Sequence, residues 1–305
     1  MSKFVLPSAA LLVSLALVAC SSAASPTAAP SGGTGSSPPG SSEPTPGGPG
    51  VDHSTGATDV VLRMEEGGGF VPIEVNAAAA PLFTLYGDGR VIFQQLQTTF
   101  PEAGPDGITR NSPWRTAQLD AGQVEELLTY ALTQGGLGTA RDNYGDVTLI
   151  DAGNTIFTID AGGLDKTVTI TALGMEPTGG PDDAARASFQ QLAERLRDFD
   201  EGGTISTDVY VPTAYRGVLI EREVDPAVPG PSPLAWPWPD LTVADFPVGD
   251  GVSAPGFPHK TLTTDEVAAL NLGDALGGAS GLIVEAPNGK TYTVVLRPLL
   301  PEESA

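Results

Sequence analysis

Cysteine is nearly absent from this 305-residue chain, which has only Cys20. A single cysteine excludes an intramolecular disulfide and a zinc site built on several cysteines. Basic residues are also scarce: 15 Lys and Arg stand against 37 Asp and Glu, and the net charge is −22. Because nucleic-acid-binding proteins normally present a basic face, we do not expect nucleic acid as a partner.

Long apolar runs are absent after the N-terminal segment. The stretch 9–19 is apolar, follows a single early cation at Lys3, and is too short to span a bilayer comfortably. This pattern predicts a signal peptide over residues 1–19. Its end, Leu-Val-Ala-Cys at 17–20, resembles the bacterial lipobox. The resemblance implies that Cys20 becomes the first mature residue and carries a diacylglyceryl group with fatty acids such as palmitate. An ordinary secretory signal ending in a chance cysteine is the alternative.

Large apolar residues are also rare in the segment that follows, which is rich in Ser, Pro, Gly and Ala. Such a segment cannot bury enough surface to offset the entropy lost on ordering. We therefore expect residues 20–57 to be a lipid anchor and a disordered tether, with His53 solvated.

The remaining chain predicts an α+β body of antiparallel strand meanders and hairpins packed with a few helices. Residues 58–202 form the first expected unit. Its predicted strands are 60–65, 71–75 (at a sheet edge because of Pro72), 82–86, 90–94, 155–160 and 167–172, and its helices are 119–132 and one that begins at Asp182 or Asp183.

A second unit is expected over residues 203–305, with strands at 208–211, 218–223, 281–285 and 291–296. The spacing of Leu119, Asp120 and Gln123 recurs at Leu262, Thr263 and Glu266, and each predicted helix precedes a hairpin. Two related ββαββ-like units explain this by duplication. Convergence on a common helix-capping pattern is the alternative.

A Pro- and Trp-rich loop, 225–259, lies within the second unit. Trp236 and Trp238 beside prolines are the only binding candidates that the sequence offers, because paired indoles can form a platform for glycans or peptides. Both rings can instead plug the small second core. We favour the plug.

Catalytic residues are conspicuously missing. His259, predicted to lie in a loop, is the one histidine of the body, and no nucleophile elbow or metal-protease motif accompanies it. We therefore expect no catalytic site, no cofactor and no enzymatic activity.

One acidic segment resembles the first half of a calcium-binding loop, with Asp198 and Asp200 as candidate ligands. The pattern then fails, because Gly202 and Val209 stand where further ligands are usual. We expect a solvated turn and no bound metal.

Three further segments resemble uncharacterised secreted lipoproteins of high-GC Gram-positive bacteria: EEGGGFVP at 65–72, LYGDGRV at 85–91 and LRPLLPEE at 296–303. The resemblance implies an extracytoplasmic protein held at the cell membrane by the lipid on Cys20, and it carries no assigned activity. We expect a binding or interaction module with an envelope protein or glycan as partner. An envelope enzyme of unidentified class is the alternative. A second alternative is a protease-inhibitor-like protein. A Gly-Gly-Phe turn and the helix start LDAGQVEEL at 119–127 resemble segments of small secreted protease inhibitors.

Overall fold

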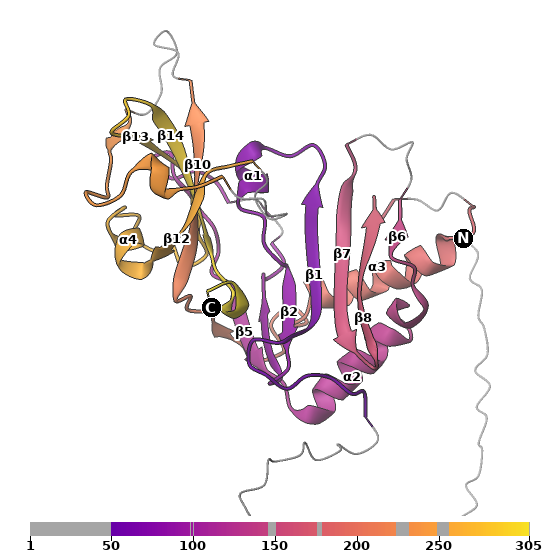
Figure 1. Cartoon of the computed structure of the whole chain (residues 1–305). Coiled ribbons are helices and arrows are strands. Elements are labelled where there is room, and N and C mark those ends of the chain that lie inside the picture. Colours follow the sequence, from indigo (N-terminus) through magenta and orange to yellow (C-terminus); the bar gives the residue numbers. More distant parts are fainter. Residues whose placement is uncertain are drawn as a thin grey trace, which may run out of the picture. The chain divides into compact units, whose positions relative to one another are not determined.

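The computed structural model describes residues 50–97, 99, 101–145, 151–175, 179–223, 232–248 and 256–304 (Figure 1). Within these residues the chain has four α-helices and two mostly antiparallel sheets, which confirms the predicted α+β class. The helices are α1 (Ile73–Ala77), α2 (Ala121–Leu132), α3 (Asp183–Arg197) and α4 (Thr264–Ala268). None of these helices has the length and apolarity needed to cross a membrane.

The first sheet has eight strands in the order β6-β8-β7-β1-β2-β3-β5-β9. Its strands are β1 (Val60–Gly68), β2 (Phe83–Tyr86), β3 (Arg90–Phe93), β5 (Arg115–Gln118), β6 (Asn143–Tyr144), β7 (Gly153–Ala161), β8 (Leu164–Thr171) and β9 (Asp208–Val209). The predicted hairpins are present, since β2 pairs with β3 and β7 pairs with β8, each across a turn that contains glycine at positive φ.

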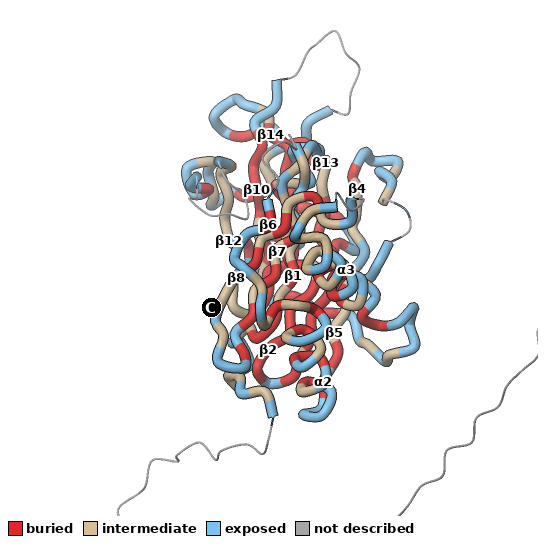
Figure 2. Tube along the Cα trace, turned by 90° about the vertical axis from the view of Figure 1, so that its right-hand side faces the viewer, coloured by how far each residue is buried: buried red, intermediate tan, exposed pale blue. Residues whose placement is uncertain are grey.

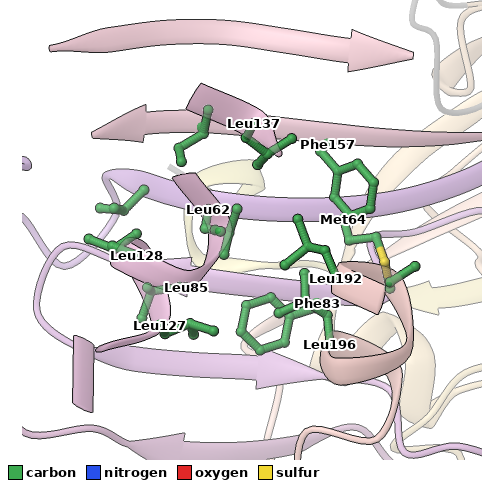
Figure 3. Close-up of a cluster of buried hydrophobic side chains, with 14 of the residues drawn as sticks. Leu62, Met64, Phe83, Leu85, Leu127, Leu128, Leu137, Phe157, Leu192 and Leu196 are labelled. Atoms are coloured by element: carbon green, nitrogen blue, oxygen red, sulfur yellow. The ribbon is translucent and has the colours of Figure 1, made fainter. Parts of the chain in front are cut away.

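Helices α2 and α3 pack against the first sheet (Figure 3). Asp120 and Gln123 form the predicted capping box of α2, and one face of that helix buries Leu127 and Leu128. Helix α3 buries Leu192 and Leu196 at helical spacing. These leucines meet strand residues of the first core, among them Leu62, Met64, Phe83 and Leu85. Asp182 precedes α3 as predicted, but its side chain makes no capping bond and pairs with Arg141 instead.

The second sheet has the order β11-β13-β14-β10-β12, and β4 also pairs with β13. Its strands are β4 (Thr109–Arg110), β10 (Ala214–Arg222), β11 (Leu234–Ala235), β12 (His259–Thr263), β13 (Ala279–Glu285) and β14 (Thr291–Pro298). A second hydrophobic core gathers on this sheet, and Figure 2 shows buried residues following the strands while exposed residues mark the loops. A turn of 3-10 helix, Pro301–Glu303, follows β14.

Two short strands cross between the halves of the chain. Strand β4 belongs to the N-terminal half but pairs with β13, and β9 belongs to the C-terminal half but pairs with β5. The described residues belong to one compact unit. Two related units therefore stay a prediction.

The sequence pattern shared by the starts of α2 and α4 is a capping box in both helices. In α4 it is formed by Thr263 and Glu266. The helices differ in length, and their hairpins join the sheets by different strands: β7 joins β1, whereas β14 joins β10. These differences favour convergence on a capping pattern over duplication.

Three segments differ from the sequence-based expectations. Residues 71–75 do not form a strand: Pro72, with φ −53° and ψ 145°, is the N-cap residue of helix α1, where the N–H that proline lacks is not needed for the helix. His53 is not fully solvated, since it forms a β-bridge with Ala161 while Val51 packs on the first core. The loop 225–259 contains β11, and His259 is the first residue of β12.

Candidate functional site

A pocket of about 570 Å³ lies at the outer edge of the second sheet. Segments that are distant in sequence surround it: the turn before β4, the residues around β11, the end of α4 and strand β13. The lining residues are Asp106, Ile108, Ser232, Leu234, Ala235, Pro237, Ala269, Leu270, Asn271, Gly281, Leu282, Ile283 and Val284. Its volume lies within the range of small-molecule pockets, and its lining is mainly apolar.

Few polar side chains line the pocket. They are Asp106, Ser232 and Asn271. Hydrogen bonds from the Arg110 side chain hold the pKa of Asp106 down at about 2, with help from the backbone N–H of Ile108, so Asp106 is a carboxylate at neutral pH. The pocket therefore offers an apolar surface, and the one carboxylate at its wall is ion-paired with Arg110.

Trp238 belongs to the second hydrophobic core and does not line the pocket. Its side chain is 3 % exposed, and its indole Nε1 donates to the Glu266 carbonyl at 2.7 Å. Half-buried Trp236 donates to the Leu241 carbonyl and meets Trp238 edge to face, with 5.0 Å between the ring centroids. Phe246 packs against both rings. This arrangement matches the plug interpretation and leaves no open face of Trp238 for a ligand.

The carboxylates of Asp198 and Asp200 accept hydrogen bonds from different partners. The Asp198 carboxylate is exposed and accepts a hydrogen bond from the N–H of Gly202. The Asp200 carboxylate is buried and accepts from Gln95 Nε2 at 2.8 Å. Among the residues that the structure describes, no three His, Cys, Asp or Glu side chains are grouped as metal ligands.

Calcium should accordingly leave the thermal unfolding midpoint of the protein unchanged at millimolar concentration. The Asp200 carboxylate already accepts a hydrogen bond from Gln95, so a Ca²⁺ ion at this turn would lack the six to eight oxygen ligands it prefers. Thermal melts with Ca²⁺ and with chelator test this expectation. A marked rise with Ca²⁺ that disappears in Asp200→Ala would contradict it.

A second group of polar residues lies between the two sheets and lines no described pocket. This inter-sheet charge cluster comprises Arg63, Glu65, Arg216, Arg297, Glu302 and Glu303. Arg297, 2 % exposed, holds Glu303 with two hydrogen bonds, of 2.8 and 2.5 Å. Glu302 pairs with Arg63 of β1 and accepts from the Tyr86 hydroxyl.

Burial and charge shift the pKa values of this cluster in opposite directions. Burial raises the pKa of Glu65 and outweighs the attraction of Arg63. Burial acts on Glu303 as well, but the hydrogen bonds and charge of Arg297 outweigh it, so the pKa of Glu303 is lowered. The last turn of the chain, Pro301–Glu303, is thereby attached to both sheets, which is a structural role.

Sequence reasoning did not find the pocket. Its segments look ordinary one by one, and only strand pairing brings Ile108 and Leu234 to the same edge of β13. The nearest sequence signal was Gly281 within a predicted strand, because a glycine there often marks a bulge or a close approach of another backbone. Cys20, the expected lipidation site, lies outside the described residues.

Comparisons with known proteins found no match to this chain among family models, curated proteins or solved structures.

Proposed function

We propose that this protein is a lipid-anchored binding module at the extracytoplasmic face of the cell membrane, and that its ligand occupies the pocket beside β13. The observation that supports binding is the pocket itself: about 570 Å³, mainly apolar, and placed at a sheet edge. An envelope enzyme, the competing class, would gather several titratable groups with shifted pKa values around its cleft. Here, among the described groups whose pKa values are shifted, Asp106 alone lines the pocket, and Glu65 and Glu303 lie in the inter-sheet charge cluster.

Anchoring rests on the lipobox-like residues that end at Cys20. Cys20→Ala should therefore yield an unprocessed precursor or a form released from the membrane, because the thiol that accepts the lipid is gone. Membrane fractionation and mass spectrometry of the mature N-terminus measure this. Ser21→Ala is the matched control and should remain anchored. An unmodified mature N-terminus at any residue other than Cys20 would refute lipidation.

Binding is tested by filling the pocket without disturbing the core. Ala269 is exposed at the end of α4 and lines the pocket, so Ala269→Trp places an indole in it. The neighbouring Ala268 is also exposed and does not line it, which makes Ala268→Trp a matched control. The full chain, immobilised in detergent, is exposed to envelope extract, and the retained proteins and glycans are identified by mass spectrometry.

We expect at least one protein or glycan to be retained by wild type and by Ala268→Trp. The amount retained by Ala269→Trp should be lower by about tenfold or more. No species with this dependence would overturn the proposal. A pocket-dependent species that is released with an altered covalent structure would also overturn it, in favour of the enzyme.

A further inference from the structure

An exposed apolar segment lies in the connection between β1 and α1 (Figure 1). Among the large apolar side chains that the structure describes, Phe70 is the most exposed, at 93 %, and Val71 and Ile73 are exposed as well. Residues 67–73, Gly-Gly-Gly-Phe-Val-Pro-Ile, include no charged side chain. We call Phe70, Val71 and Ile73 the apolar knob. Neighbouring exposed apolar side chains, unlike single ones, are typical of interaction sites.

The backbone at the base of the knob is fixed on the first sheet. Gly68 and Gly69 have positive φ, and the Val71 N–H donates to the Gly69 carbonyl at 3.1 Å. A Cβ at Gly69 would lie 3.0 Å from the Gly153 nitrogen, so this turn packs closely on the start of β7. Because the turn is already held in place, binding through Phe70 requires little further ordering of the backbone.

The pocket beside β13 provides a surface that matches the knob. Among its lining residues, Leu282 and Val284 are buried, whereas Leu234 is 54 % exposed. Its volume of about 570 Å³ is in the range that holds drug-sized molecules, so an aromatic ring fits into it. Phe70 of the same chain is exposed and does not line the pocket. A ring that enters the pocket therefore comes from another molecule, and it would cover apolar surface that a single chain leaves exposed.

Charge favours contact between these two surfaces over contact elsewhere. Copies of a chain with a net charge of −22 repel one another. The knob carries no charge, and the one ionisable side chain in the pocket lining, Asp106, is paired with Arg110. Two copies can therefore meet here without an unpaired charge at the centre of the contact.

The pocket lining disfavours a glycan. Sugars carry hydroxyl groups that need hydrogen-bond partners when they are buried. The uncharged polar side chains of the lining are only Ser232 and Asn271. An apolar side chain of a protein suits this lining better.

We infer that the apolar knob of one copy of this protein inserts into the pocket of a second copy, with the Phe70 ring against the apolar lining. The contact joins different surfaces of the two copies and is therefore heterologous. This inference rests on the proposed binding function and names the ligand as a second copy of the chain. A contact built on one knob is smaller than a standard interface, so we expect weak association that confinement to the membrane strengthens.

Photo-crosslinking in cells tests the contact on the full chain. Phe70 is replaced by p-benzoylphenylalanine, which keeps an uncharged aromatic side chain, and crosslinked peptides are identified by mass spectrometry. Crosslinks should join residue 70 to pocket-lining residues of another copy. Ala269→Trp in the same chain should lower the yield of crosslinked dimer by about tenfold or more, and Ala268→Trp should not. The same crosslinker at Val211, which is 69 % exposed, is the control and should give no crosslink to the pocket.

Mixing two variants separates this contact from other self-association. The mature chain with Cys20→Ser cannot take a lipid and is studied without detergent by sedimentation velocity. Phe70→Ser removes the knob and Ala269→Trp fills the pocket, so each alone should raise the dissociation constant by about tenfold or more. An equimolar mixture should associate again, because one variant keeps the pocket and the other keeps the knob. Added salt should strengthen association, since it screens the repulsion between acidic copies.

The inference is overturned by crosslinks from residue 70 only to lipid, glycan or another protein, by a mixture that stays monomeric, or by association that weakens with salt. If these experiments fail while envelope extract yields a pocket-dependent protein or glycan other than this chain, the second-copy inference fails and the binding function stands. If no experiment shows pocket dependence, both fail.

Discussion

Trp238→Ala should lower the free energy of unfolding by roughly 3 to 5 kcal/mol, the range for truncating large aromatic side chains in cores. Trp238 is 3 % exposed and lies in the second core with Phe246 and Leu262. The substitution leaves a cavity and removes the donor that satisfies the Glu266 carbonyl. Urea denaturation, followed by circular dichroism, measures the change.

Two controls separate a plug from a platform. Leu234→Ala truncates an apolar side chain that is 54 % exposed, so it should alter stability by far less. Trp238→Phe keeps an aromatic ring but loses the hydrogen bond, and should fall between Trp238→Ala and wild type. An unchanged denaturation midpoint for Trp238→Ala, with loss of binding to a glycan array, would contradict the plug.

Glu303→Gln should destabilise the protein at pH 7 by about 3 to 5 kcal/mol, because it removes the carboxylate that neutralises the nearly inaccessible Arg297. The pKa of Glu303 is lowered in the folded state, so its contribution is present above the unfolded value of 4.5 and is lost as the pH falls through the folded pKa. The difference between wild type and Glu303→Gln should therefore shrink in acid. Denaturant melts between pH 7 and pH 3 measure this.

Glu65 provides the matched comparison within the same cluster. Its pKa is raised, so the folded state disfavours its charge above that pKa, and the penalty is relieved as the pH falls. Glu65→Gln should leave stability at pH 7 equal to or higher than that of wild type. Equal losses for Glu65→Gln and Glu303→Gln would show that the cluster does not distinguish the two carboxylates.

Local structure was predictable where neighbouring residues determine it. Asp120 and Gln123 mark the start of α2, and the glycines around Asp88 mark the turn of the β2–β3 hairpin. The alternation of apolar residues at 71–75 wrongly predicted a strand, because Pro72 is compatible with the residue before a helix as well as with an edge strand. Local patterns thus specify elements well unless one residue suits two conformations.

Long-range pairing was not predictable by the same means. Neither residues 109–110 nor 208–209 carry a signal for the sheet they join. The pocket depends on that pairing, and so does the meeting of Arg63 with Glu302, which is 239 residues away. A single sequence shows which residues are apolar or charged, but the partner of each depends on chain topology.

The position of β14 has a consequence for folding kinetics. This strand, Thr291–Pro298, comes last along the chain, yet it lies between β13 and β10 in the second sheet. The second sheet therefore cannot close until synthesis has passed Pro298. Strand β4 can pair only after β13 has been synthesised, and β5 gains its partner β9 only after residue 209. Premature termination of synthesis therefore leaves edges of both sheets without their native neighbours. Such a topology favours slow folding after synthesis over stepwise folding during it.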